Sequence, residues 1–207
     1  MLSYEIVVAF GFAALLLSMA PGPDNIFVLT QSAVSGVRSG ILVVLGLCTG
    51  LIFHSTAVAL GLAALIKASA VAFIVLKFTG AAYLLYLAYK AFRAPVQQLG
   101  ENSPRIRDAE LYRRGLIMNI TNPKVAIFFL AFFPQFTDPS QGALVFQIAQ
   151  LGLIFVLVTF VVFGVIALAA GGLSNWLTKS PKAQLIINKV AGIVFVGLAA
   201  KIAFSNR

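Results

Sequence analysis

Two side chains of opposite charge stand inside long apolar segments of this chain. Asp24 and Lys124 each directly follow a proline. A charged group within a membrane span costs about 2.5–3.5 kcal/mol on insertion scales, so such a group needs a partner or a function. Capping of a helix end by Asp24 would return only about 0.3–1 kcal/mol. One carboxylate and one ammonium together suit a zwitterion, which carries both charges, and a buried carboxylate can also carry a proton.

Both charges stand at breaks in apolar segments. The first break consists of Pro21, Gly22 and Pro23, and the second is at Pro123. Proline loses no hydrogen bond at the first position of a helix, and its φ angle is already helical. We therefore predict that a helix restarts at each break and presents free N–H groups and a positive dipole end, which attract carboxylates. Such backbone is tolerated at this depth only within protein or beside a watery cavity.

Three asparagines near the breaks are further candidates for a binding site. Asn119 and Asn122 lie one turn apart on one helix face, and Asn25 stands beside the first carboxylate. Helix capping is the alternative explanation for Asn122. Lys124 can hold a substrate carboxylate with Asn119 and Asn122 while a substrate ammonium faces the aspartate. Alternatively, Lys124 extends to the lipid headgroups, since Arg114 is only ten residues away.

The single histidine, His54, is the second candidate for proton coupling beside Asp24, because imidazole titrates near physiological pH. A neutral histidine bonded to a neighbouring helix is the alternative. Gly46, Gly50 and His54 follow one another at intervals of four, so this helix face allows another backbone to come close. With one cysteine, Cys48, neither an internal disulfide nor a cysteine metal cluster can form, and the sequence predicts no metal site and no cofactor.

The composition indicates which elements position these residues. The chain is 60% hydrophobic and 10% charged, whereas a soluble domain carries about 25% charged residues. Long apolar stretches therefore predict membrane spans, and only helices satisfy their own backbone in lipid. No convincing signal peptide precedes the first span. The six predicted spans cover approximately residues 5–33, 40–66, 71–92, 114–136, 144–172 and 186–205.

The polar segment 93–113 divides the chain into residues 1–92 and 114–207, with three spans each. One set of loops holds 11 of the 15 Lys and Arg residues, and the other set holds 4. By the positive-inside rule, segment 93–113 is a cytoplasmic loop and both termini lie outside. This bias also explains the net charge of +9 without a nucleic-acid partner.

The two halves resemble each other. Pro23 and Pro123 are 100 residues apart, and Lys77 and Lys189 each precede a glycine by three residues. These matches indicate an internal repeat, although chance similarity between apolar helices is the alternative. Because each half has an odd number of spans, the repeats would be inverted, as in many transporters. The predicted fold is an all-α membrane protein with six transmembrane helices in two inverted three-helix repeats, in which helices 1 and 4 are interrupted at proline.

Four segments resemble the LysE/RhtB family of amino-acid exporters across essentially the whole chain. They are 21-PGPD-24, 46-GLCTGLIFH-54, 75-VLKFTGAAYLLYLAYKAFR-93 and 119-NITNPKVAIFFLAFFPQF-136. The resemblance is strongest to the homoserine, homoserine lactone and threonine efflux branch. It implies a multi-pass exporter of small amino acids in the bacterial inner membrane, driven by proton antiport. Asp24 is typical of threonine exporters, whereas the second and fourth spans are homoserine-like, so the substrate stays open.

Other function classes fit the residues less well. No nucleophile faces a base and no phosphate-binding loop is present, which argues against an enzyme. A channel would favour a ring of like charges. A membrane channel, an intramembrane enzyme and a non-transporting scaffold remain the alternatives. The predicted partners are a small amino acid, protons and the lipid bilayer, and the sequence leaves a homo-oligomer open.

Overall fold

The structure, a computed structural model, describes residues 2–68, 70–94 and 106–204. All regular elements in these ranges are helical, which confirms the all-α prediction for the described residues. The α-helices are α1 (Tyr4–Met19), α2 (Pro23–Ser35), α3 (Val37–Ala68), α4 (Ala70–Phe92), α5 (Asp108–Thr121), α6 (Pro123–Ile127), α7 (Leu144–Lys179) and α8 (Pro181–Phe204). Three short turns lie between α6 and α7, namely the π-helix η1 (Phe128–Phe132) and the 3-10 helices η2 (Phe133–Phe136) and η3 (Pro139–Gln141).

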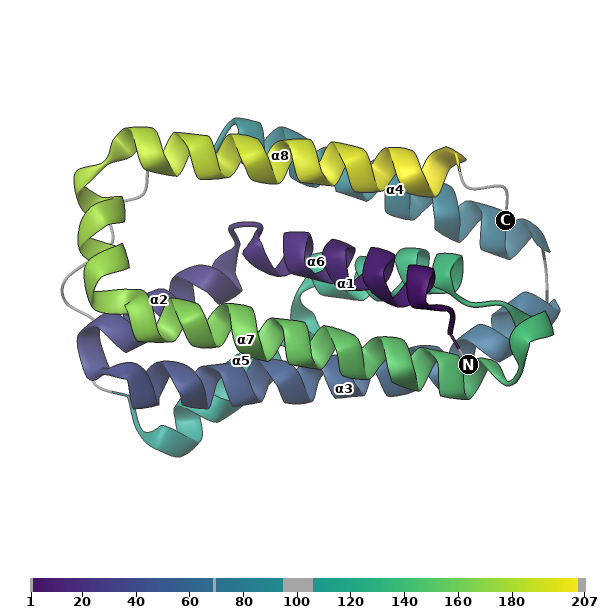
Figure 1. Cartoon of the computed structure of the whole chain (residues 1–207), viewed down its shortest axis with the longest axis horizontal. Helices are drawn as coiled ribbons and strands as arrows, with labels where there is room; N and C mark the ends of the chain where they lie inside the picture. Colours follow the sequence, from purple (N-terminus) through teal and green to yellow (C-terminus); the bar gives the residue numbers. More distant parts are fainter. Residues whose placement is uncertain (1, 69, 95–105, 205–207) are drawn as a thin grey trace.

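Both predicted helix breaks are present. The axes of α1 and α2 are bent by 62°, and those of α5 and the segment from Pro123 to Phe136 by 48°. Pro23 and Pro123 are the first residues of α2 and α6, where a missing N–H costs nothing. Gly22 and Asn122 precede them with extended backbone. The two breaks bring four helix ends together inside the bundle, where Asn122 of the second break donates a hydrogen bond to Asp24 of the first (Figure 1).

The helix before the second break begins earlier than predicted. It begins at Asp108 rather than at residue 114, so the end of the predicted loop 93–113 is helical. Residues 95–105 of that loop lie outside the described residues. Asp108 and Glu110 occupy the first turn of α5, where carboxylates interact favourably with the helix dipole. Glu110 also accepts a hydrogen bond from Nε of Arg114 at 3.0 Å, one helical turn later.

The segment after the second break is not a regular α-helix, although the sequence predicts one to residue 136. It changes to π-helix at Phe128 and to 3-10 helix at Phe133, next to Pro134, which has no N–H to donate. This change of winding lets consecutive phenylalanines turn inward. Phe128, Phe129, Phe132 and Phe133 are all fully buried and stack with one another. They form an aromatic core next to the second break.

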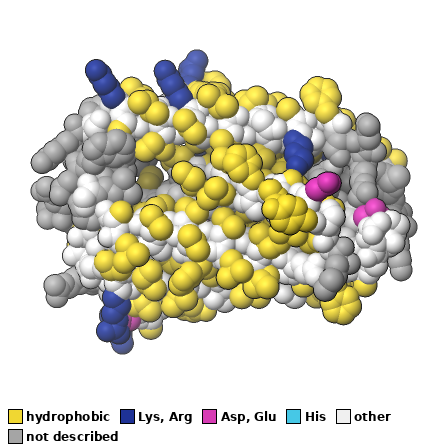
Figure 2. Space-filling view, viewed as in Figure 1, with side chains coloured by type: hydrophobic (Ala, Val, Ile, Leu, Met, Phe, Trp, Pro, Cys, Tyr) yellow, Lys and Arg dark blue, Asp and Glu magenta, His cyan; other side chains and the backbone are white. Residues whose placement is uncertain are grey.

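The outer surface of the helices suits lipid. Three described segments are long and apolar enough to cross a membrane, at Val37–Gly61, Leu144–Ala170 and Lys182–Phe204. The two bent pairs each pass the same test as one unit, which gives up to five crossing elements among the described residues. Leu60 and Phe146 are each 73% exposed, and Figure 2 shows hydrophobic side chains over most of one face, with few charged ones. The count of six spans stays a prediction, although its third span is helical as α4.

The helices pack reciprocally. Successive passes run in alternating directions along the long axis, and the free ends of α1 and α8 lie at the same end of the bundle (Figure 1). α3 packs on α7 and α4 packs on α8. The broken helix of each half lies against the middle helix of the other half, since α5 packs on α3 and both α1 and α2 pack on α7. Two repeats related by a pseudo-twofold axis would pack in this way.

Glycines bring α3 and α5 into backbone contact. A Cβ atom on Gly46 would lie 2.7 Å from the backbone nitrogen of Leu116 and would overlap the carbonyl oxygen of Tyr112. A Cβ atom on Gly50 would lie 2.7 Å from the Cβ atom of Asn119. From the other side, Gly115 of α5 faces the carbonyl group of Val43. The predicted close approach along the glycine face of α3 is therefore confirmed.

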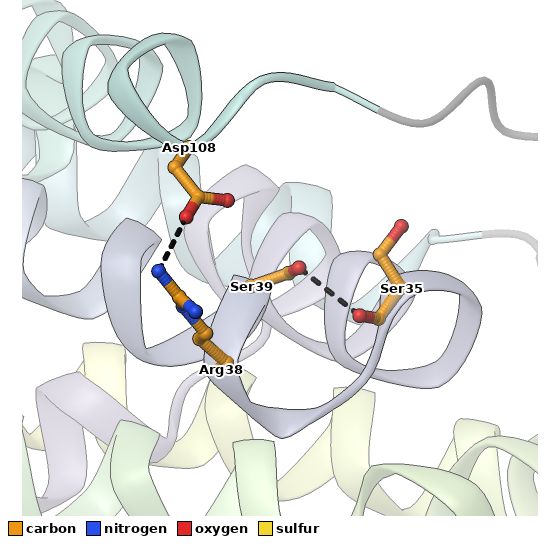
Figure 3. Close-up of polar contacts among 4 residues, drawn as sticks. All are labelled: Ser35, Arg38, Ser39 and Asp108. Atoms are coloured by element: carbon orange, nitrogen blue, oxygen red, sulfur yellow. Dashed lines mark hydrogen bonds and ion pairs between the residues drawn. The ribbon is translucent and has the colours of Figure 1, made fainter.

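An ion pair links the first turns of α3 and α5, at the end of the two helices that lies away from the second break. Figure 3 shows Arg38, whose guanidinium lies 2.8 Å from the carboxylate of Asp108. Beside it, the hydroxyl of Ser39 donates to the carbonyl of Ser35 across the turn at Gly36, which has a φ angle of 88°. The side chains of Arg38 and Asp108 are 84% and 56% exposed, so the pair contributes about 0–1 kcal/mol to stability.

Candidate functional site

A small cavity lies at the two helix breaks. It offers about 20 Å³ to the centres of water-sized molecules, which is room for about one water. This space does not admit an amino acid in the present conformation, so the surrounding groups must move to bind one. The walls are apolar except for two charged groups, one amide and two hydroxyls. The lining residues are Leu17, Ser18, Asp24, Leu47, Leu51, Asn119, Lys124, Val125, Phe155, Thr159 and Phe163.

Asp24 is buried in the first turn of α2, with only 3% of its surface exposed. Its Oδ2 atom accepts a hydrogen bond from Nδ2 of Asn122 at 2.9 Å, which connects the two breaks. Its Oδ1 atom is buried and has no hydrogen-bond partner. A carboxylate oxygen can accept two hydrogen bonds, so Oδ1 is an unused acceptor at the cavity.

Lys124 is buried at the start of α6 and lines the same cavity. Its Nζ atom donates to the carbonyl oxygens of Ala20 at 3.3 Å and Leu17 at 3.5 Å. These carbonyls belong to the last turn of α1 and its cap, where the helix dipole favours a cation. The alternative in which this side chain extends to the lipid headgroups is therefore wrong. An ammonium has three N–H donors, so one remains for another acceptor.

Asp24 and Lys124 share the cavity without forming an ion pair. Each has its own partners from the opposite break, and the ion pairs of the described residues do not include these two groups. Gly22 stands close to the ammonium, since a Cβ atom there would lie 3.3 Å from Nζ. A negative and a positive group therefore face one small space, each with hydrogen-bonding capacity left.

Of the three candidate asparagines, one lines the cavity and two cap helix ends. Asn122 caps α6, since its Oδ1 atom accepts from the backbone nitrogen of Lys124 at 3.0 Å, and it also donates to Asp24. Asn119 lines the cavity, and its buried Oδ1 atom has no partner. Asn25 does not line the cavity; its Nδ2 atom donates to the carbonyl of Ser18 at 2.8 Å and so caps the end of α1.

His54 does not line the cavity, but it contacts Asn119, which does. Its Nε2 atom is 3.2 Å from the carbonyl oxygen of Asn119, and since a carbonyl only accepts, this nitrogen carries the proton. The imidazole also stacks on Phe129, with ring centres 5.3 Å apart. The structure thus brings His54 to the backbone of a cavity residue but not into the cavity itself. Its role in proton coupling stays a prediction.

The sequence reasoning missed two cavity residues, Ser18 of α1 and Thr159 of α7. Their hydroxyl oxygens are 3.3 Å apart and buried. Each is the only polar side chain of a long apolar run, 6–20 for Ser18 and 151–173 for Thr159. That isolation is the signal that could have identified them. The described residues hold no group of three or more histidine, cysteine, aspartate or glutamate side chains that could bind a metal.

Comparisons with known proteins identify the family of this chain. The family model for the LysE type translocator matches residues 15–206. The homoserine/homoserine lactone efflux proteins of Salmonella typhimurium and Salmonella typhi are 35% and 34% identical over 206 residues, or 98% of this chain and 98% of theirs. An uncharacterized membrane protein of Vibrio cholerae is 34% identical over 198 residues, or 94% of this chain and 95% of its own. No solved structure matches the chain.

The resemblance seen in the four sequence segments is therefore confirmed over nearly the whole chain. The chain belongs to the LysE family of translocators, and it is a multi-pass membrane transport protein rather than an enzyme.

Proposed function

We propose that this protein exports small amino acids such as threonine or homoserine, or homoserine lactone, across the bacterial inner membrane. One observation carries the proposal, namely that the buried side chains of Asp24 and Lys124 line a single cavity where two interrupted helices meet. A free amino acid has an ammonium and a carboxylate a short distance apart, and this cavity has an acceptor and a donor for them. The names of the Salmonella relatives, homoserine/homoserine lactone efflux proteins, support a substrate of this class.

The binding mode follows from the unused hydrogen-bonding groups. We assign the substrate carboxylate to the remaining N–H of Lys124, near the start of α6. The substrate ammonium is a triple donor and suits the two buried oxygens without partners at the cavity, Oδ1 of Asp24 and Oδ1 of Asn119. Asn122 then supports the aspartate, and Asn25 supports the end of α1, so neither needs to touch the substrate. This differs from the sequence-based expectation, in which both Asn119 and Asn122 helped to hold the carboxylate.

Export against a gradient needs an energy source, and we propose proton antiport. Asp24 is the proposed proton carrier because it is a buried carboxylate that would face the substrate ammonium. A carboxylate cannot bind a proton and pair with an ammonium equally well at one time, so the two compete. His54 is the second candidate, and it would act on the site through the backbone carbonyl of Asn119.

The proposed architecture has six spans in two inverted repeats, with segment 93–113 in the cytoplasm and both termini outside. The reciprocal packing of α3 on α7 and of α4 on α8 supports it. In a Cys48→Ser background, a thiol reagent that cannot cross the membrane should label a cysteine at Ser140 from outside. A cysteine at Ser103 should react only from the cytoplasmic side. The opposite labelling would reverse the orientation.

Counterflow in proteoliposomes tests the function itself. Vesicles that contain the purified protein and are loaded with unlabelled homoserine should take up labelled homoserine transiently above its equilibrium level, because a carrier exchanges solutes. A channel would give no stimulation by internal solute, and a scaffold would give no saturable flux. A panel of unlabelled amino acids and homoserine lactone as competitors would then identify the substrate.

A further inference from the structure

The two hydroxyls in the cavity are unusual for hydroxyls within membrane helices. In such helices, serine and threonine commonly donate to the carbonyl four residues earlier in the same helix. In α3, Thr49, Ser55 and Thr56 do so at 2.8–2.9 Å. Ser18 and Thr159 instead pair with each other across the cavity wall, from α1 and α7.

This pair keeps free hydrogen-bonding capacity. Two hydroxyls have two O–H donors and four lone pairs. Their mutual bond at 3.3 Å uses one donor and one lone pair. Ser18 and Thr159 are 5% and 4% exposed, so neither bulk water nor lipid satisfies the rest. One O–H donor and several lone pairs therefore remain for a polar group within the cavity.

The pair comes from other helices than the groups that would hold the charges of a zwitterion, although all of them line the same cavity. Asp24 and Lys124 come from the restarted helices α2 and α6, whereas Ser18 and Thr159 belong to α1 and α7. The other walls, formed by leucine, valine and phenylalanine, have no side-chain hydrogen bonds to offer. The polar side chain of a substrate can therefore form hydrogen bonds with Ser18 and Thr159, which the ammonium and the carboxylate of the substrate do not need.

We infer that Ser18 and Thr159 are specificity-determining residues that bind the side-chain hydroxyl of a short hydroxy amino acid. The inference rests on the proposed function and adds to it which part of the substrate is distinguished, and by which residues. A hydroxyl is both donor and acceptor. A substrate hydroxyl can therefore accept from the unused O–H of the pair and donate to one of its unused lone pairs. An aliphatic side chain of the same length would leave the buried pair partly unsatisfied, which costs affinity.

The sharpest test compares homoserine with 2-aminobutyrate, which is homoserine without its hydroxyl. Counterflow of both labelled solutes in the same proteoliposomes should show that the wild-type protein prefers homoserine in kcat/KM by about tenfold or more. Thr159→Val and Ser18→Ala should each reduce homoserine exchange and leave 2-aminobutyrate exchange unchanged or faster. The preference should fall toward one in the double variant. Thr159→Ser keeps the hydroxyl and should retain the preference.

Thr56→Val is the matched control, since this exposed hydroxyl bonds its own helix and should not affect the ratio. Equal kcat/KM values for the two solutes in the wild-type protein would overturn the inference. So would parallel losses for both solutes in the single variants, because they would make the pair a helix-to-helix contact only. If wild-type vesicles exchange neither solute and also neither threonine nor homoserine lactone, the proposed function fails, and this inference fails with it. Exchange of the lactone alone would overturn this inference and leave the proposed function standing.

Discussion

Replacement of Lys124 by glutamine should weaken export of amino acids far more than export of homoserine lactone. The lactone keeps the ammonium, but its carboxyl group is closed into an ester and carries no negative charge. Lys124 is the cation at the cavity, and its Nζ atom already donates to two carbonyls at 3.3 and 3.5 Å. The remaining N–H would form one charge-assisted bond to a substrate carboxylate, worth roughly 1.5–3 kcal/mol.

A loss of that size corresponds to a roughly ten- to hundredfold decrease in kcat/KM for homoserine. Homoserine lactone should lose only the smaller amount that follows from weaker capping of α1. Both fluxes should be measured in the same vesicles, so that differences in protein amount cancel in the ratio. Lys189→Gln is the matched control, because this lysine of α8 is exposed and does not line the cavity. Equal decreases in kcat/KM for the amino acid and the lactone would mean that Lys124 only caps the end of α1. The proposed hydrogen bond to the substrate carboxylate would then be wrong.

Asp24→Asn should abolish uphill export while exchange down a gradient persists at a reduced rate, measured with and without an imposed proton gradient; uphill export at the wild-type rate would contradict the coupling role. His54→Asn should lower the rate and alter its dependence on pH between about 5 and 8, where imidazole titrates, and an unchanged pH profile would leave His54 as a packing residue. Gly46→Ala should destabilise the protein by about 1–3 kcal/mol, because the new Cβ atom overlaps the backbone of α5, and a thermal melt in detergent would measure it. Gly61→Ala in the same helix meets no atom within 4 Å and should not lower the melting temperature, so equal effects of the two changes would contradict the packing argument.

The features that could be predicted from the sequence are residues whose type is unfavourable in an apolar helix. Prolines and charges are costly in an apolar span, so Pro23, Pro123 and the charges after them stood out and located the breaks and the cavity. Single hydroxyls are cheap in a helix because the backbone can satisfy them. Ser18 and Thr159 therefore gave only the weaker signal of their isolation in apolar runs, and their tertiary pairing shows what sets them apart.

Other features depend on partners that the local sequence does not specify. Both Asn119 and Asn122 were expected to face a substrate carboxylate because they share a helix face. Which amide faces the cavity was decided by the bond between Asn122 and Asp24, which joins residues 98 positions apart. Likewise, the first turn of α5 is polar and lies outside the apolar span, so hydropathy alone placed the helix start too late.

The contacts between the two halves at the cavity have a consequence for the strength of cargo binding. Asn122 holds Asp24, and Lys124 holds Ala20 and Leu17, so each of these bonds ties a residue before the central loop to a residue after it. A cavity with room for about one water must widen before a solute enters, and widening strains or breaks these ties. The free energy of solute binding must offset the loss of these hydrogen bonds. The apparent affinity is therefore the affinity of the open state multiplied by the fraction of molecules that are open. A carrier with this self-bonded closed state would bind its cargo more weakly than a carrier that is already open, so its rate would rise with the cargo concentration over a wide range.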